Sequence, residues 1–164
     1  MKMVTLNGEM YDGEVFKPFS TEKRNLATER IVTEADLPAW RNAMVDDYDS
    51  YWAKGYGDVV FYYWVDGQDR KTLGVIADRK GGLYLSYEEY TPHFRTLDSC
   101  FSLYDDKALS EVLTVSDDFF VSKGLFLPAE LAWKGIEHFV KTGMPSPEIV
   151  WITADDLPLD GNWA

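Results

Sequence analysis

The stretch LPAELAWKGIEHFVKTGMPSPEIVW, from Leu127 to Trp151, decides the fold prediction because it carries the signals of a helix followed by a strand. Pro128 and Glu130 suit a first helical turn, where a missing N–H costs nothing and a carboxylate complements the helix dipole. Gly143 is placed to end the helix as a left-handed cap. One side of the helix is apolar at helical spacing, with Leu131, Gly135, Ile136, Phe139 and Val140.

Two prolines, Pro145 and Pro147, prevent any continuation of that helix. The residues that follow, EIVWI at 148–152, are short, apolar and β-branched, so they predict a strand that returns to a sheet. The whole stretch therefore predicts a helix locked against a sheet.

A second helix is predicted upstream, in TEADLPAWRNAMVDDYDSYW at 33–52. Thr33 and Asp36 resemble a capping box at its start. Gly55 and Gly57 end it. An apolar stripe recurs at helical spacing, with Leu37, Trp40, Met44 and Tyr48.

Strands are predicted between the two helices. VVFYYWV at 59–65 is typical of a strand buried on both faces, and Asp66-Gly67 is a hairpin signal. Residues 71–78 and 82–89 predict two more strands, the second alternating between a dry and a wetter face. Residues 111–117 predict another. Residues 93–106 fit either a strand with a bulge or an irregular loop.

The order of these elements predicts the α+β class, with a mostly antiparallel sheet packed by two main helices. At 164 residues the chain is expected to form a single domain over 1–164, with the weakest signals at 1–30 and 153–164.

A net charge of -12 excludes the usual nucleic-acid-binding and membrane-surface classes, because both depend on lysine and arginine. The same charge would attract a basic protein and speed its encounter with this one. Cys100 is the only cysteine, which suits a reducing compartment. The sequence carries neither a signal peptide nor an apolar stretch of membrane-spanning length, so we expect a soluble, cytoplasmic protein.

The search for chemistry finds no phosphate loop, metal motif or nucleophile motif, so we expect no catalytic residue, no metal and no cofactor. His138 on the predicted helix has no histidine partner at ligand spacing, and His93 matches no motif. A pair of Cys100 with a histidine stays a formal alternative. Adjacent carboxylates are plentiful, and in a chain with 28 acidic residues they are most simply solvated loop charges.

Six tryptophans and ten tyrosines exceed the needs of one core, so some are expected to reach the surface as interface anchors. A sheet that is simply rich in these residues is the alternative. The predicted loops that mix aromatic and acidic residues are the candidate binding surface for a basic partner. Its residues are Glu88, Glu89, Tyr90, Tyr104, Asp105, Asp106, Asp117 and Asp118.

The stretch from Leu127 to Trp151 also resembles the C-terminal signature of the Imm-one family, the immunity proteins of bacterial polymorphic toxin systems. The matching positions are Gly143, Pro147 and Trp151, expected to have structural roles. LGVIADRKGGLYLSY, from Leu73 to Tyr87, is similar to the central hairpin of that family.

The resemblance implies a protein that is not an enzyme and that binds and neutralises a cognate toxin as a heterodimer. Toxins paired with this family include deaminases and nucleases, whose basic grooves an acidic, aromatic-rich surface could cover. Two alternatives stay open: an acidic protein-binding or scaffolding module of another role, and a carboxylate-dependent hydrolase.

Overall fold

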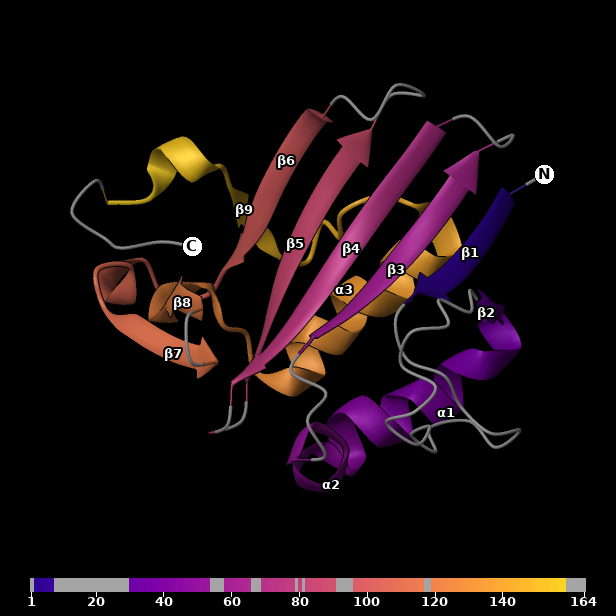
Figure 1. The fold of residues 1–164 in the computed structure, drawn as a ribbon, viewed down its shortest axis with the longest axis horizontal. Helices are drawn as coiled ribbons and strands as arrows, with labels where there is room; N and C mark the ends of the chain where they lie inside the picture. The colour runs from indigo at the N-terminus through magenta and orange to yellow at the C-terminus, as the bar shows by residue number, and fades with distance from the viewer. Residues whose placement is uncertain are drawn as a thin grey trace.

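A seven-stranded antiparallel sheet forms the centre of the protein (Figure 1), with strand order β2-β1-β3-β4-β5-β6-β9. The computed structural model describes residues 2–7, 30–53, 58–65, 69–78, 80, 82–90, 96–116 and 119–158. The strands are β1 Lys2–Asn7, β2 Arg30–Val32, β3 Asp58–Val65, β4 Asp69–Asp78, β5 Gly82–Tyr90, β6 Thr96–Leu103 and β9 Val150–Ile152. A separate pair is formed by β7, Val112–Ser116, and β8, Phe119–Ser122. The prediction of an α+β fold with a mostly antiparallel sheet is confirmed.

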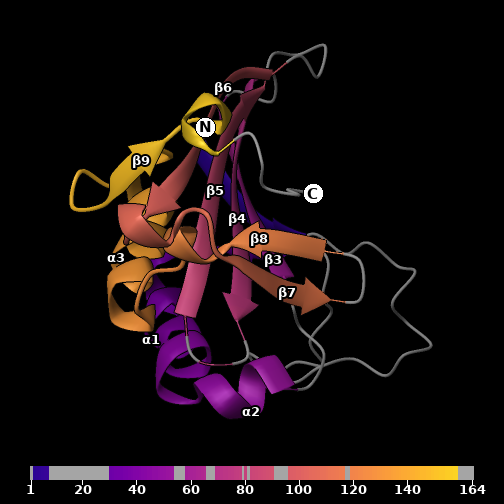
Figure 2. The same cartoon turned by 90° about the vertical axis from the view of Figure 1, so that its left-hand side faces the viewer.

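Both predicted helical segments lie on one face of the sheet (Figure 2). The C-terminal one is α3, Ala129–Thr142, a continuous helix. The N-terminal one is broken into a 3-10 turn at Glu34–Asp36, α1 at Leu37–Arg41, a π-helical turn at Asn42–Asp46 and α2 at Tyr48–Ala53. The predicted capping box is present, because the Thr33 N–H donates to Asp36 Oδ2 at 2.8 Å.

The main core fills the space between these helical segments and the sheet. The predicted stripe of the N-terminal segment is confirmed, since Leu37, Trp40 and Met44 are buried and Tyr48 is half-buried. On β5 the predicted alternation holds over Leu85–Glu88, but Tyr84, expected on the wetter face, is buried. The sheet and α3 contribute Val59, Phe61, Tyr63, Leu73, Val75, Ala77, Leu83, Leu85, Tyr87, Ala132, Trp133, Ile136, Phe139 and Val140.

Helix α3 packs closely on β5 at a glycine. A Cβ added to Gly135 would lie 2.6 Å from Leu85 Cδ1 and 2.7 Å from Ile149 Cδ1, so any larger residue would require these two side chains to shift. The apolar side of α3 differs from the prediction at its first turn. Ala132 and Trp133 are buried there, whereas Leu131 is half-buried. Helix α3 is therefore rotated about its own axis, so that Trp133 faces the core more directly than Leu131 does.

The prediction that β3 is buried on both faces is wrong. Val59, Phe61 and Tyr63 are buried, but Val60 and Tyr62 between them are only half-buried. The reason is that both helical segments cover the same face of an antiparallel sheet, so burial alternates along the strand.

The other face of the sheet carries a smaller core at one end, where β7 and β8 cross it (Figure 2). Tyr84 of β5 is buried there and packs on Phe126, with ring centroids 6.0 Å apart. The strand predicted at residues 111–117 is confirmed as β7 over Val112–Ser116, although it pairs with β8 and not with the main sheet. The small core is completed by Ile76, Phe101, Leu103, Leu109, Leu113, Val115, Val121, Leu125, Ile152 and Leu157.

The predicted end of α3 is confirmed. Gly143 has φ 71° and its N–H donates to the Phe139 carbonyl at 2.7 Å, so it is a left-handed C-terminal cap. The chain then returns to the sheet as β9, as predicted. Trp151 fixes this return, because its indole N–H donates to the Ser146 carbonyl at 2.9 Å.

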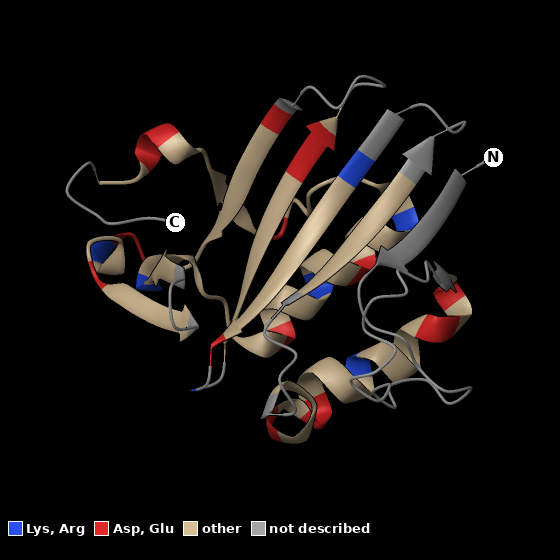
Figure 3. Ribbon diagram, in the orientation of Figure 1, with Lys and Arg blue, Asp and Glu red and all other residues tan. Residues whose placement is uncertain are grey.

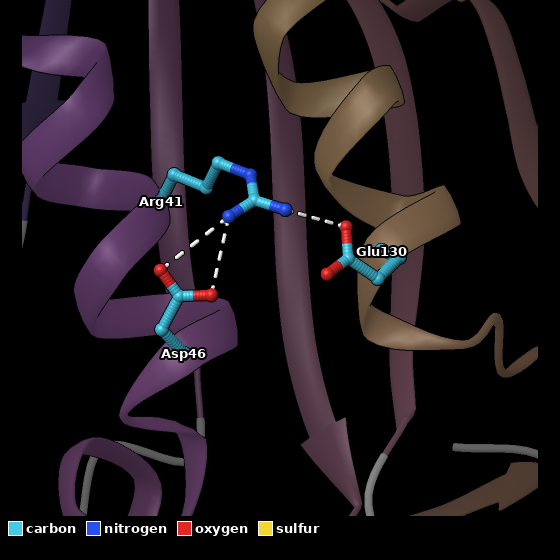
Figure 4. A network of polar contacts seen from close by, with 3 residues as sticks. All are labelled: Arg41, Asp46 and Glu130. Carbon is cyan, nitrogen blue, oxygen red and sulfur yellow. Dashed lines mark hydrogen bonds and ion pairs between the residues drawn. The ribbon is translucent and has the colours of Figure 1, made fainter.

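An ion-pair network on the surface joins the two helical segments (Figure 4). One Arg41 nitrogen lies 3.1 Å from Asp46 Oδ1 and another lies 2.6 Å from Glu130 Oε2 on α3. The hydrogen bond with Glu130, followed by the charge of Glu130, raises the pKa of Arg41. Because the three side chains are partly exposed, the network orients the helices more than it stabilises them.

Four of the described elements named next were not predicted or were left open. Strands β1 and β2 come from the N-terminal region of weakest signal. Residues 93–106 contain β6, and the irregularity lies where its pairing with β5 shifts register at Glu89 and Tyr90. The C-terminal tail contains a 3-10 turn at Ala154–Asp156. The remaining part of 1–30, the turn signals at 55, 57 and 66–67, and residues 159–164 lie outside the described residues.

None of the described helices has the length and apolar character needed to cross a membrane.

Candidate functional site

The adjoining ends of β5 and β6 carry three carboxylates (Figure 3). In the antiparallel register, Glu89 of β5 is directly opposite Asp98 of β6, and Glu88 is opposite Ser99. Like charges directly opposite each other on neighbouring strands destabilise a sheet. We call Glu88, Glu89 and Asp98 the acidic corner.

The acidic corner faces both sides of the sheet. Glu89 lies on the same side as buried Tyr87, two residues earlier, and Asp98 lies opposite it on that helix-covered side. Glu88 and Tyr90 lie on the other side. The corner therefore borders both faces at one end of the sheet, where a partner can contact it from the edge.

No basic side chain in the described part of the chain forms an ion pair with the acidic corner. Lys71 of β4 is the register partner of Glu89, but its ammonium lies 3.3 Å from Met144 Sδ. Asp98 Oδ1 accepts a hydrogen bond from the Ser99 N–H at 2.9 Å. Glu89 Oε2 accepts one from the Tyr87 hydroxyl at 3.5 Å. The corner thus keeps its negative charge without a cation inside the described protein.

Two titratable groups behind the corner are neutral at physiological pH. Burial, followed by the charge of Asp98, raises the pKa of Cys100 to about 11. Burial, followed by the charges of Glu89 and Asp98, raises the pKa of Tyr87. A protonated, half-buried thiol is a weak nucleophile, so Cys100 is poorly suited to covalent chemistry. Cys100 and Tyr87 therefore add no negative charge to that of the acidic corner.

The second group of predicted site residues is at the opposite end of β6. Tyr104 is 58% exposed, and Asp105 and Asp106 follow it at the surface. Asp105 already has a structural role, because its side chain accepts the Lys107 N–H at 3.0 Å and caps a 3-10 turn. Six residues of strand separate Asp98 from Tyr104, a distance of about 20 Å at 3.3 Å per residue. The structure therefore does not gather the two predicted groups into one small site.

The two remaining predicted site residues, Asp117 and Asp118, lie outside the described residues. Some aromatic side chains were expected to reach the surface, and in the described residues Tyr104 does so, whereas the alternative of a fold simply rich in these residues accounts for most of the others. Ten of the seventeen described aromatic side chains are buried, and Tyr104 alone is exposed to more than about a third. The buried rings fill the two cores, where they pack edge to face on one another, as Trp40 does on Phe61.

Of the three positions that resemble the family signature, two have a structural role in the described residues. Gly143 caps α3 and Trp151 anchors the return of the chain, whereas Pro147 is exposed in the turn between them. None of the three belongs to the acidic corner. The described residues contain no group of three or more histidine, cysteine, aspartate or glutamate side chains that could hold a metal ion. His138 is half-buried on α3, and His93 lies outside the described residues.

Asp98 is the site residue that the sequence reasoning missed. It belongs to residues 93–106, where strand and loop were both open, so its register with Glu89 was not predictable. The only local signal was a carboxylate within an apolar and hydroxyl-bearing run, TLDSCFSL.

Comparisons of the chain with protein-family models, with curated proteins and with solved structures found no match. The resemblance to the Imm-one family therefore stays a prediction drawn from residues 73–87 and 127–151.

Proposed function

We propose that this protein is an immunity protein that acts in the cytoplasm, where it binds a cognate toxin of a bacterial polymorphic toxin system and covers its basic groove. The observation that carries the proposal is the acidic corner, in which Glu89 and Asp98 face each other in register and neither forms an ion pair with a described basic side chain. A sheet would be more stable without this repulsion. Charges retained against stability are typical of binding sites, where the partner supplies the compensating charge.

Two further features support the same proposal. The net charge of -12 gives the protein a field that accelerates encounter with a basic partner and hinders contact with nucleic acid. Tyr90 lies beside the corner on the face that the helices leave open, and tyrosine is a frequent anchor in protein interfaces. The corner inhibits by occlusion in this proposal, so no catalytic residue is required.

The experiment is neutralisation of the toxin whose reading frame neighbours the gene for this chain. We expect the purified wild-type protein to form a one-to-one complex that abolishes toxin activity on its substrate. In the triple variant Glu88→Gln, Glu89→Gln and Asp98→Asn, we expect association to slow roughly tenfold, with a weaker dependence on salt. The amides keep the shape and hydrogen-bonding oxygens of the carboxylates, so a folding defect is not expected. Association rates are measured by stopped-flow fluorescence.

A matched control removes three charges elsewhere on the surface, through Asp47→Asn, Asp49→Asn and Asp155→Asn, all at exposed positions. We expect this control to bind within about threefold of wild type, because it removes the same net charge and leaves Glu88, Glu89 and Asp98 unchanged. Full toxin activity in the presence of excess wild-type protein would refute the immunity function. Equal slowing of both triple variants would show that net charge, and not the corner, directs binding.

A further inference from the structure

The outer edge of β6 is only partly covered. β6 extends from Thr96 to Leu103, but its outer neighbour β9 pairs only with Phe101, Ser102 and Leu103. No described strand lies along the first five residues of β6 on that side (Figure 1). Among the described residues, the sheet therefore ends in a short open edge at Thr96–Cys100, which includes Asp98 of the acidic corner.

A capping interaction turns the chain away from this edge. β9 runs antiparallel to β6, so its continuation after Ile152 would cover the residues that precede Phe101. Instead, Asp156 Oδ2 accepts the Thr153 N–H at 2.8 Å and the Thr153 hydroxyl at 3.2 Å. The 3-10 turn that these bonds close diverts the backbone from the sheet.

The orientation of the backbone at the open edge follows from neighbouring hydrogen bonds. Backbone groups point alternately to the two sides of a strand. The Leu85 N–H points toward β6, where it donates to Ser102 Oγ at 2.9 Å, so Tyr87 and Glu89 point the same way and meet Cys100 and Asp98. Ser99, between these two β6 residues, therefore points outward. Consistent with this, its N–H donates to the side chain of Asp98 and not to β5.

We propose that an extended, basic segment of the partner adds to the sheet along β6 at Thr96–Cys100, as an extra edge strand. This inference rests on the proposed immunity function and names the mode of contact. The Ser99 N–H and C=O are the backbone groups that receive the segment, and the N–H exchanges Asp98 for a carbonyl of the partner. Strand addition of this kind gains affinity from main-chain hydrogen bonds and specificity from side chains on alternate positions. A lysine or arginine of the segment then lies beside Asp98 and Glu89.

The charges of the protein oppose a second copy of the chain as the occupant. Edge-to-edge pairing of two copies through β6 would bring the Asp98–Glu89 pair of one copy next to that of the other. Each copy also carries a net charge of -12, so the two molecules repel each other. Inward and edge charges are a known means of preventing such self-pairing. The same charges attract a basic strand, so they select the partner and reject the copy.

The test compares Ser99→Pro with Ser99→Ala in binding the purified toxin encoded beside the gene. Proline removes the outward N–H and is tolerated at an edge position whose N–H faces solvent, whereas alanine keeps the N–H and removes only the hydroxyl. We expect Ser99→Pro to weaken binding roughly tenfold or more, and Ser99→Ala to bind within about twofold of wild type. Hydrogen exchange on the wild-type complex should show new protection of the Ser99 amide. Sedimentation of the free protein should show a monomer.

The outcomes separate this inference from the function on which it rests. If the wild-type protein does not bind the toxin, the immunity function and the inference both fall. If it binds but the Ser99 amide gains no protection, or if a folded Ser99→Pro variant binds as wild type does, the edge-strand mode alone is refuted. If Ser99→Pro unfolds, as circular dichroism would show, the N–H is not free and the inference is refuted as well. A dimer through this edge would refute the choice of occupant.

Discussion

At the scale of single residues, Gly143 shows how one backbone conformation holds the fold together. Its φ of 71° lies in the left-handed region, and a Cβ at this position would lie 2.6 Å from Cδ1 of the Tyr63 ring. Left-handed conformation costs roughly 1–2 kcal/mol for any residue with a Cβ. The position therefore requires glycine for two independent reasons, of which the sequence showed only the first.

We predict that Gly143→Ala lowers the free energy of unfolding by at least about 1–2 kcal/mol, because backbone strain and contact with the Tyr63 ring add together. The measurement is urea denaturation. Gly74→Ala is the matched control, since its added Cβ meets Ser86 Cβ at an ordinary 3.7 Å. We expect this control to be neutral or to stabilise by about 0.5–1 kcal/mol. Equal effects of the two variants would contradict the argument.

At the scale of elements, Tyr84 of β5 belongs to the small core that the main sheet shares with β7 and β8. Its ring packs on Phe126 on one side and on Phe101 on the other, at centroid distances of 6.0 and 5.9 Å. Burial in this small core raises the pKa of Tyr84 to about 12 from 10.0. Ionisation of this phenol is therefore coupled to opening of the small core.

We predict that stability falls as the pH rises from about 10 to about 12. The unfolded chain loses the Tyr84 proton at the lower pH and the folded chain retains it, so the stabilisation is complete below pH 10 and is lost as pH approaches 12. A shift of this size corresponds to about 2–3 kcal/mol. Tyr84→Phe should flatten this part of the stability curve, as measured by urea denaturation at each pH. An unchanged slope in the variant would contradict the assignment to Tyr84.

At the scale of the whole molecule, the excess of negative charge acts on stability as well as on partners. The net charge of -12 repels itself across the folded surface, and the acidic corner adds a direct cross-strand repulsion between Glu89 and Asp98. Salt screens such interactions, because the Debye length falls from about 30 Å at 0.01 M to about 8 Å at 0.15 M. The free energy of unfolding should therefore increase as the ionic strength rises.

We predict that the melting temperature rises between 0.01 and 0.15 M NaCl, as measured by calorimetry. The triple amide variant of the acidic corner should melt about 1–3 °C above wild type at the lower salt concentration, from a relief of about 0.2–1 kcal/mol. The control at Asp47, Asp49 and Asp155 has the same net charge but leaves the cross-strand pair intact, so its gain should be smaller. A corner variant less stable than wild type would refute the view that Glu89 and Asp98 strain the sheet.

The sequence by itself determined the elements whose signals are local. The capping box of Thr33, the left-handed glycine at 143 and the alternation along β5 each depend on neighbours within one turn or one strand. The first two are present in the structure, and the alternation is present over Leu85–Glu88. The same Thr-x-x-Asp pattern recurs at residues 153–156, where it closes the turn that leaves β6 uncovered. That local signal was available in the sequence, although its consequence for the sheet edge was not.

Tertiary structure alone decided which residues meet. Register between β5 and β6 places Glu89 opposite Asp98 and leaves Ser99 facing outward, and nothing near either residue in the chain specifies that pairing. Likewise, the layering of both helical segments on one face decided that β3 alternates and that most aromatic rings are buried. Periodicity encodes which side of an element is apolar, but contact between distant segments depends on packing summed over the whole core. For this reason the sequence predicted the helix and strand of residues 127–151, while the acidic corner and the open edge beside it emerged only from the folded sheet.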